Sequence, residues 1–444
     1  MADQGKQMGH SWTLALMVTS TAIGGTLQYG YNLAIMNAPT NFIQGFVNDT
    51  CRERWDVQLE DYQVTLVWTI IVSMFSLGGL AGALIAGPMT IHFGRKKCML
   101  LNNVFLMSAA LLALTSRAAR SFEMIIISRV LVGINAGISM NVQPMYFGES
   151  APKHLRGAVS LSCAVFTAFG VVLGQVVGLR EILGSEPYWH YLLASNAIPG
   201  FIQLLTLPWF PESPRYLLID RGDKEACIKA LRQLRGCEVQ AGELDEMLQE
   251  QAQSSGVRPS RPWELLADRA HRWQLLSVIF ISSAMQLCGN DSVRGEGGQR
   301  NLLIELKGRR FMLMGGYILM CCWAVVFTIA LSFEHVVSWM PYLSMTCIFT
   351  YILSFGMGPA GVTGVLPTEL FSQTARPAAY MIAGSMMWIN LFIVGMLFPF
   401  LVTKGKTLSE ITSEFNKLNF KGQQEKSLSP AQYQLGEVGL STSL

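Results

Sequence analysis

Residues 94–97 read Gly-Arg-Lys-Lys, and residues 149–156 read Glu-x6-Arg, with apolar stretches around each motif. Both motifs recur in the same order at 308–310, which read Gly-Arg-Arg, and at 369–376. The charged members of the two copies are Arg95, Glu149, Arg156, Arg309, Glu369 and Arg376. A polar motif that repeats in order indicates an internal duplication. Parallel repeats of this kind are typical of membrane transporters whose substrate site lies between the two halves.

The composition is that of a membrane protein. The 444 residues are 51% hydrophobic and only 14% charged, whereas soluble domains carry roughly a quarter charged residues. Most of the chain is therefore expected to face a lipid bilayer or other buried helices. The net charge of +3 is too small to indicate a nucleic-acid partner. The sequence shows no metal-ligand cluster, phosphate-binding loop or nucleophile triad, so we expect no metal, no cofactor and no enzymatic activity.

Apolar runs of ~20 residues are long enough to cross a bilayer as helices, and they predict an all-α membrane protein. The runs lie near 11–32, 64–87, 98–116, 122–145, 158–179, 188–210, 273–293, 311–333, 341–366 and 378–402. We predict an N-terminal six-helix half at 1–219 and a cytosolic helical segment at 220–270. A C-terminal half at 271–403 and a polar, partly disordered cytosolic-type tail at 404–444 follow.

Basic residues mark the loops after the second, fourth and sixth runs, which places these loops and the N-terminus in the cytosol. The loop after the first run is then outside, and its Asn48-Asp49-Thr50 predicts an N-glycosylation site, with a chance match as the alternative. In the cytosolic segment, residues 225–234 and 242–253 have helical patterns, and 263–266 resemble a short third helix. We interpret the segment as a latch between the halves; a flexible linker is the alternative.

The two halves differ in length. Compared with the first half, the second lacks about 46 residues before its basic motif and about 28 after its Glu-x6-Arg motif. Residues 294–304 are polar and too short to cross a bilayer, so we predict that the eighth and twelfth helices are absent. The topology of residues 273–310 and of the tail is left open by the sequence. An alternatively spliced product or an incomplete gene model explains these gaps better than a ten-helix design.

Charged side chains at the predicted cytosolic ends can form a gate. Glu212 and Arg215 end the first half, and with Arg95, Glu149 and Arg156 they can form ion pairs between helices. Such a network can close in one state of the protein and break in the other. The alternative is that these charges only fix the topology. Arg129, within the fourth run, is an intramembrane charge and so a functional candidate.

Polar residues inside the apolar runs favour recognition of a neutral polyol. Residues 28–32 read Gln-Tyr-Gly-Tyr-Asn, and amides and phenols bind hydroxyl groups without a net charge. Hydrogen bonding between helices is the alternative role. No Asp or Glu lies between Trp12 and Asn37, which favours passive transport over proton coupling. Residues 286–292 form a glycine-interrupted polar stretch typical of a midplane site. Trp388 can stack on a sugar ring or act as an interfacial anchor.

The motifs together resemble those of sugar porters of the major facilitator superfamily, and within them the class II facilitative hexose transporters. The resemblance rests on Gly94-Arg95-Lys96, Glu149-x6-Arg156-Gly157, Pro211-Glu212-Ser213-Pro214-Arg215, Gly358-Pro359, Glu369-x6-Arg376-Pro377, and on residues 24–40, 283–293 and 361–366. It covers nearly the whole chain except residues 294–304 and the far tail. It implies the major facilitator fold, with about ten of the usual twelve transmembrane helices.

The resemblance also implies a substrate site between the halves. The positions that match sugar-contacting or pore-facing positions of the family are Tyr29, Gln175, Gln286, Asp291 and Trp388. Departures from the family pattern are Ala164, Cys288, Gly364 and Met387. They suggest a wider pocket that takes fructose and/or glucose.

Two functions follow from the resemblance. The first is facilitated diffusion of a hexose by alternating access, in a multi-pass protein of the plasma membrane. The alternative is a truncated or spliced variant that does not transport and is retained in the endoplasmic reticulum. We expect little or no uptake by this chain, because two pore-side helices are absent from its sequence.

Overall fold

The structure is a computed structural model that describes residues 2–152, 155–235, 241–254, 265, 272–287, 309–332, 343, 346, 347, 350, 351, 354, 370, 371 and 375–403. All regular elements in these residues are helical, as predicted. Those of the first half are α1 (Ala2–Ala22), η1 (Ile23–Leu27), α2 (Gln28–Ala34), α3 (Thr40–Trp55), α4 (Asp61–Phe93), α5 (Arg95–Ser116), α6 (Phe122–Ser150), α7 (Arg156–Val177), α8 (Trp189–Ala194), α9 (Ala197–Thr206) and η3 (Leu207–Trp209). Those that follow are η4 (Tyr216–Asp220), α10 (Lys224–Arg235), α11 (Ala241–Ser254), α13 (Arg272–Leu287), α15 (Arg309–Ser332) and α19 (Arg376–Thr403).

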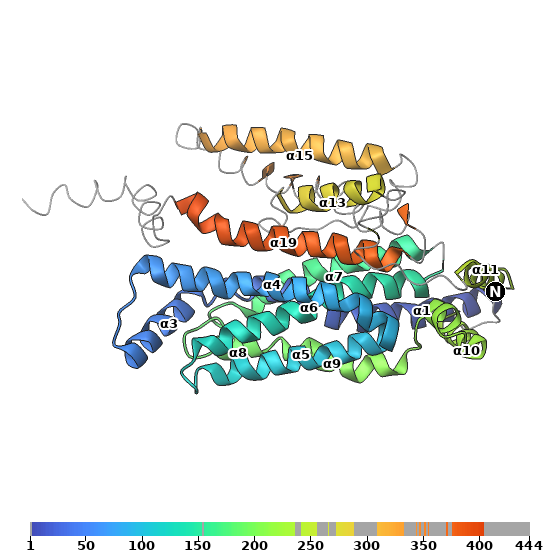
Figure 1. The fold of residues 1–444 in the computed structure, drawn as a ribbon, viewed down its shortest axis with the longest axis horizontal. Helices are drawn as coiled ribbons and strands as arrows, with labels where there is room; N and C mark the ends of the chain where they lie inside the picture. The colour runs from blue at the N-terminus through green and yellow to red at the C-terminus, as the bar shows by residue number, and fades with distance from the viewer. Residues whose placement is uncertain are drawn as a thin grey trace, which may run out of the picture.

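The long helices run along the long axis of the molecule (Figure 1). In that view α4, α6 and α7 lie between α5, α8 and α9 on one side and α13, α15 and α19 on the other. The N-terminus, α10 and α11 lie at one end, and α3 lies at the opposite end. By length and composition, four helices in the described part can cross a membrane: Tyr62–Phe93, Arg95–Ser116, Phe122–Ser150 and Ala378–Leu397. They agree with four of the predicted membrane runs.

Small residues allow α4 and α6 to cross closely. A Cβ atom on Gly78 would lie 2.2 Å from the carbonyl oxygen of Val130, and one on Gly137 would lie 2.2 Å from that of Gly79. No real side chain fits at such distances, so the two backbones are in direct contact. Close approach of this kind is the main source of helix association in lipid, where apolar burial alone gives little driving force.

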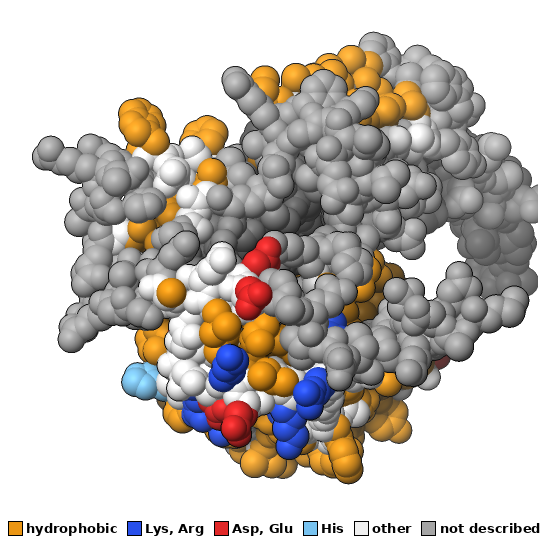
Figure 2. Space-filling view, turned by 90° about the vertical axis from the view of Figure 1, so that its right-hand side faces the viewer, with side chains coloured by type: hydrophobic (Ala, Val, Ile, Leu, Met, Phe, Trp, Pro, Cys, Tyr) orange, Lys and Arg blue, Asp and Glu red, His pale blue; other side chains and the backbone are white. Residues whose placement is uncertain are grey.

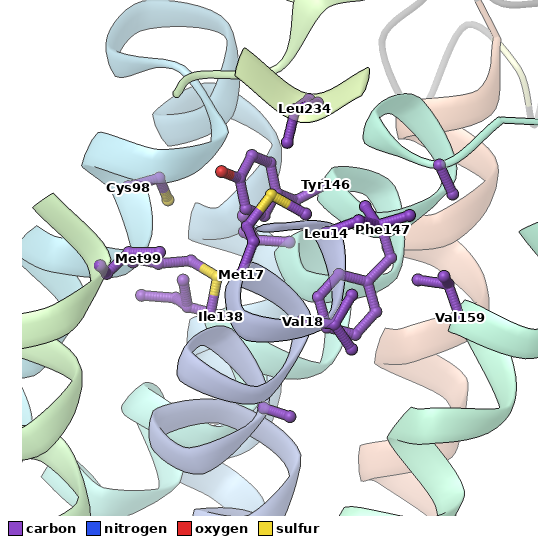
Figure 3. Packing of buried hydrophobic residues seen from close by; sticks show 14 of the residues in the cluster. Leu14, Met17, Val18, Cys98, Met99, Ile138, Tyr146, Phe147, Val159 and Leu234 are labelled. Atoms are coloured by element: carbon purple, nitrogen blue, oxygen red, sulfur yellow. The ribbon is translucent and has the colours of Figure 1, made fainter. Parts of the chain in front are cut away.

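A buried apolar cluster joins the start of the chain to the first half and to α10 (Figure 3). Met17 of α1 and Tyr146 and Phe147 of α6 are fully buried in it. Leu234 of α10 lies above Tyr146 in Figure 3 and is 1% exposed. The first helical part of the 220–270 segment is therefore packed on the first half rather than extended away from it.

The helices of the segment itself confirm two of the sequence expectations. The pattern at 225–234 forms α10 and that at 242–253 forms α11. Leu231 of α10 and Met247 of α11 are buried against Leu218 of η4. Leu265 packs with α13 and α19 of the second half. The rest of the proposed third helix at 263–266 lies outside the described residues, so the latch between the halves stays a prediction.

Three details of these helices were not predicted. The described part of the predicted first membrane run is helical throughout, but the π-helical turn η1 lies between α1 and α2. The sixth run is divided at Ser195 and Asn196, between α8 and α9. The outer loop that carries Asn48 is the helix α3, whose apolar residues Ile43 and Val47 are buried against the bundle. The predicted run 341–366 and the gap at 294–304 lie outside the described residues, apart from single positions in the former.

Candidate functional site

Two of the five predicted substrate residues meet where the halves touch. Trp388 of α19 lies edge-on to Tyr29 of α2, with ring centroids 5.8 Å apart and an interplanar angle of 84°. Phe75 of α4 completes the group, 5.5 Å from Trp388 and 6.2 Å from Tyr29. All three rings are almost fully buried. A Cβ on Gly79 would lie 2.3 Å from the Trp388 ring, so α4 is shaped to receive this side chain.

Two polar groups of the described residues belong to or lie beside the aromatic cluster, the indole nitrogen of Trp388 and the guanidinium of Arg129. The indole nitrogen of Trp388 is buried and has no hydrogen-bond partner in the described residues. Arg129 of α6 places its guanidinium 4.8 Å from the Phe75 ring centre, and its Nη1 lies 3.5 Å from the carbonyl oxygen of Asn32. No ion pair within the described part of the chain includes Arg129. The partner that the sequence left unnamed is therefore backbone and an aromatic ring.

The structure gives less information on the other three predicted substrate residues. Gln175 is in the last turn of α7 and is exposed. Gln286 belongs to the last turn of α13, and its side chain lies outside the described set. Asp291 also lies outside the described residues. The structure therefore brings Tyr29 and Trp388 together and leaves the remaining positions as predictions.

At the end of the bundle that carries α10 and α11, Arg95 is the centre of a charged network. Its Nη2 lies 2.8 Å from Oε1 of Glu149, and its Nη1 lies 2.8 Å from Oδ2 of Asp220. The guanidinium also stacks on the ring of Tyr216, 4.8 Å from its centroid. Ser213 donates a hydrogen bond from its hydroxyl to the second oxygen of Glu149. The predicted pair Arg95–Glu149 is present, and it links α5 to α6.

Glu212 has a different role from the predicted ion pair. Its Oε1 accepts hydrogen bonds from the backbone amides of Lys96, at 2.8 Å, and of Ser213, at 3.0 Å. Lys96 is in the first turn of α5, where amides have no partner within the helix. Gly94, which precedes α5 with φ of 88°, has no side chain that could accept a hydrogen bond from these amides. Glu212 therefore caps α5 from a distant part of the chain and places negative charge at its positive end.

The structure locates the backbones of most of the remaining residues that the sequence predicts to form the gate. Arg156, Arg309 and Arg376 are the first residues of α7, α15 and α19, as Arg95 is of α5. Their side chains, and the whole of Glu369, lie outside the described set. Arg215 is half-buried just before η4. Figure 2 shows this end of the molecule, where basic and acidic side chains gather around an apolar patch.

Asp220 is the network member that the sequence analysis missed. Its carboxylate pairs with Arg95 although 125 positions separate the two residues. Burial raises the pKa of Asp220 above its ordinary 3.8, Arg95 opposes this effect, and the neighbouring Glu149 carboxylate adds to it. An acid placed eight residues after Glu212, at the end of a short helix, is the only signal in the sequence, and it belongs to no repeated motif.

These features define a class of protein. The arrangement of helices matches the solved major facilitator superfamily structure of the proton:xylose symporter XylE bound to 6-bromo-6-deoxy-D-glucose, with a TM-score of 0.69 over 88% of this chain and 89% of that chain, at 19% identity. An inward open form of XylE from E. coli matches with a TM-score of 0.64. The fold is therefore that of the major facilitator superfamily.

Sequence similarity places the chain in a specific family within this fold. A family model described as Sugar (and other) transporter matches residues 17–294 and 301–414, and the chain belongs to this family. It is 51% identical to the human solute carrier family 2, facilitated glucose transporter member 11, over 92% of this chain and 94% of that protein. The mouse facilitated glucose transporter member 5 is 40% identical over 87% of this chain and 83% of that protein. As the sequence predicted, the family consists of membrane transporters rather than enzymes.

Proposed function

We propose that this chain is built to carry a hexose, fructose or glucose, passively across the plasma membrane by alternating access. The observation that carries the proposal is the contact of Tyr29 and Trp388, which brings the two halves together at a buried aromatic group that includes the indole nitrogen of Trp388. Aromatic faces and neutral donors and acceptors suit a sugar. Family membership and the word "facilitated" in the names of the relatives support the same conclusion.

Passive transport is favoured over coupling to protons by the composition of the first membrane segment. From Trp12 to Asn37 there is no Asp or Glu, and Arg129, which approaches this segment, forms no ion pair within the described residues. A proton-driven carrier requires a group that titrates in the pathway. The Arg95 network at the other end supplies the gate, since its ion pairs link α5, α6 and η4 and can break together.

The alternative, a variant of such a carrier that does not transport, is favoured by two specific observations. The alignment with human member 11 extends over 464 positions, more than the 444 residues of this chain, so that protein has residues for which this chain has none. The match to the family model is also interrupted between residues 294 and 301, inside the segment where the sequence predicts a missing helix.

The two functions are separated by uptake measurements in proteoliposomes. This chain is compared with a version in which the aligned segments of human member 11 fill its gaps, using labelled fructose and glucose, with L-glucose as the control for leakage. Saturable uptake of a D-hexose by the filled version alone supports the non-transporting variant. Saturable uptake by this chain excludes that variant. If neither protein takes up a hexose, the proposed substrate class is wrong.

A further inference from the structure

The first membrane segment changes its helical geometry at η1. A π-helical turn contains one more residue than an α-helical turn. Each residue of an α-helix advances the direction of the side chains by about 100°. The turn at Ile23–Leu27 therefore sets the direction in which every side chain of α2 points relative to α1. Tyr29 is the second residue of α2 and follows η1 directly.

Two buried glutamines from other helices hold this turn. Gln143 of α6 accepts a hydrogen bond at its Oε1 from the backbone amide of Thr26, at 2.9 Å, and donates from Nε2 to the Thr26 hydroxyl, at 3.1 Å. In a continuous α-helix the Thr26 amide would donate to the carbonyl of Ala22. Gln143 thus provides the acceptor that the π-helical turn denies to this amide.

Gln203 of α9 acts on the other side of the turn. Its Nε2 donates to the carbonyl oxygen of Thr21 at 3.1 Å, and its Oε1 accepts from Asn103 of α5 at 2.8 Å. Gln143 and Gln203 are 0% and 1% exposed, so these bonds form away from water. In such a place a lost partner leaves an unpaired polar group, which is costly.

Gly24 and Gly25 make room for the two glutamines. A Cβ on Gly25 would lie 2.0 Å from Oε1 of Gln143, and a Cβ on Gly24 would lie 2.3 Å from Cδ of Gln203. Any side chain at either position would displace the glutamine. The two glycines therefore leave the space that the two glutamine side chains need to reach the π-helical turn.

Side chains of α2 contact two different parts of the structure. Tyr29 faces Trp388, whereas Tyr31 shares a hydrogen bond with Ser195, and Gln28 donates to the carbonyl of Asn196. A return of η1 to α-helical geometry would rotate α2 relative to α1 by about 100°. Both sets of contacts would then be lost together.

We propose that Gln143 and Gln203 are positioning residues that set the register of α2 and thereby direct Tyr29 at Trp388. Their effect on sugar recognition rests on the proposed function of those two aromatic residues. The effect on register does not, because it concerns only the contacts within the protein.

The experiment uses the full chain and follows the fluorescence of Trp388, taken as the difference between each protein and its Trp388→Phe counterpart. Gln143→Leu removes the acceptor for Thr26, and Gln143→Met does so with a side chain of similar length. The rescue variant adds a deletion of Gly25 to Gln143→Leu, which removes the extra residue of the π turn and restores continuous α-helical bonding. The control is Asn102→Leu, which breaks buried hydrogen bonds between α5 and α6 away from η1.

We expect the Trp388 emission to shift in both Gln143 variants, to return in the rescue variant, and to stay unchanged in Asn102→Leu. An unchanged emission in the Gln143 variants, no recovery in the rescue variant, or an equal shift in the control would each overturn the proposal. In the gap-filled carrier, Gln143→Leu should weaken hexose binding about tenfold, with recovery on rescue. If no version binds hexose while the emission behaves as expected, the proposed function fails and the register proposal stands.

Discussion

The rings of Trp388 and Tyr29 are nearly perpendicular and in contact, so that a residue of α19 in the second half packs against a residue of α2 in the first. Trp388 is 0% exposed and also contacts Phe75. Its ring occupies the position next to Gly79 that a larger side chain would fill. Among the described residues, the buried apolar cluster around these rings joins α2, α4, α5, α6 and α19. It therefore serves both the stability of the contact between the halves and the proposed site.

Replacing Trp388 with alanine should destabilise the protein strongly. The change removes a fully buried aromatic side chain, for which losses of about 3–5 kcal/mol are typical. We expect a clear fall in the midpoint of thermal unfolding in detergent. Trp209→Ala is the matched control, because Trp209 is 80% exposed, and its midpoint should change little. Equal losses in the two variants would contradict the role of Trp388 between the halves.

Arg95→Gln should weaken the charged end of the bundle. The variant leaves Glu149 and Asp220 close together without their shared cation, and Glu149 is only 16% exposed. Breaking one side of a buried pair costs about 3–5 kcal/mol; we expect about 3 kcal/mol, because Asp220 is 36% exposed and partly screened. Thermal unfolding is the measurement, with the exposed neighbour Lys97→Gln as control. A similar effect of both variants would exclude a specific network.

The stability contributed by Asp220 should decrease as the pH rises. Its pKa in the folded protein is raised above 3.8, mainly by burial, so folding favours the protonated carboxyl over the charged one. Stability is then lost as the pH rises from 3.8 through the raised pKa, and it stays lower above that value. Asp220→Asn, which does not titrate, should gain in thermal midpoint relative to the parent between acidic and neutral pH. A constant difference across this range would refute the assignment.

Glu212 should stabilise α5 as a cap. Glu212→Ala leaves the amide of Lys96 without its acceptor, and losses of about 0.5–2 kcal/mol are typical when a cap is removed. Glu212→Gln keeps a carbonyl acceptor and should lose less. Thermal unfolding of the two variants distinguishes the cap from an ion pair. If the glutamine variant loses as much as the alanine variant, charge rather than hydrogen bonding is what Glu212 supplies.

Asn48 should carry an N-linked glycan in cells that glycosylate. Although it lies within α3, its Oδ1 accepts the backbone amide of Leu59 at 3.2 Å, and its side-chain nitrogen, the atom that is modified, is not used by this bond. We expect a shift in electrophoretic mobility on enzymatic deglycosylation. Asn48→Gln should abolish the shift, and Asn103→Gln, outside any acceptor motif, should retain it. No shift in the parent protein would show that the motif is a chance match.

The membrane helices α4, α5 and α6 were predictable because each is a long apolar run between polar ends. The helix α3 was not, since residues 40–55 are too polar to suggest membrane contact and bury only one narrow side. The π turn was also hidden, because its cause lies in Gln143 and Gln203, which are distant in the sequence. Two adjacent glycines in an apolar run were the only local sign.

The candidate site was also predicted only in part. Arg95 and Glu149 belong to a repeated motif, and their positions at the predicted cytosolic ends of helices indicated that they could form an ion pair. Asp220 belongs to no motif, and its contact with Arg95 depends on how η4 packs under α5. Glu212 was predicted to belong to the site, but its hydrogen-bond partner is the backbone amide of Lys96. Every residue except proline has a backbone amide, so the sequence does not indicate which one Glu212 binds. Patterns of side chains therefore predict ion pairs better than they predict caps.

The distance along the chain between Arg95 and its two distant partners has a consequence for biosynthesis. The ribosome must add 125 further residues after Arg95 before Asp220 exists, which takes about 6–25 s at ordinary rates of translation. Before residue 212 is made, the first turn of α5 lacks its cap, and before residue 220 is made, Arg95 has Glu149 but not Asp220 as a carboxylate partner. A nascent chain arrested before residue 212 would therefore lack both the cap of α5 and the second carboxylate of the Arg95 network.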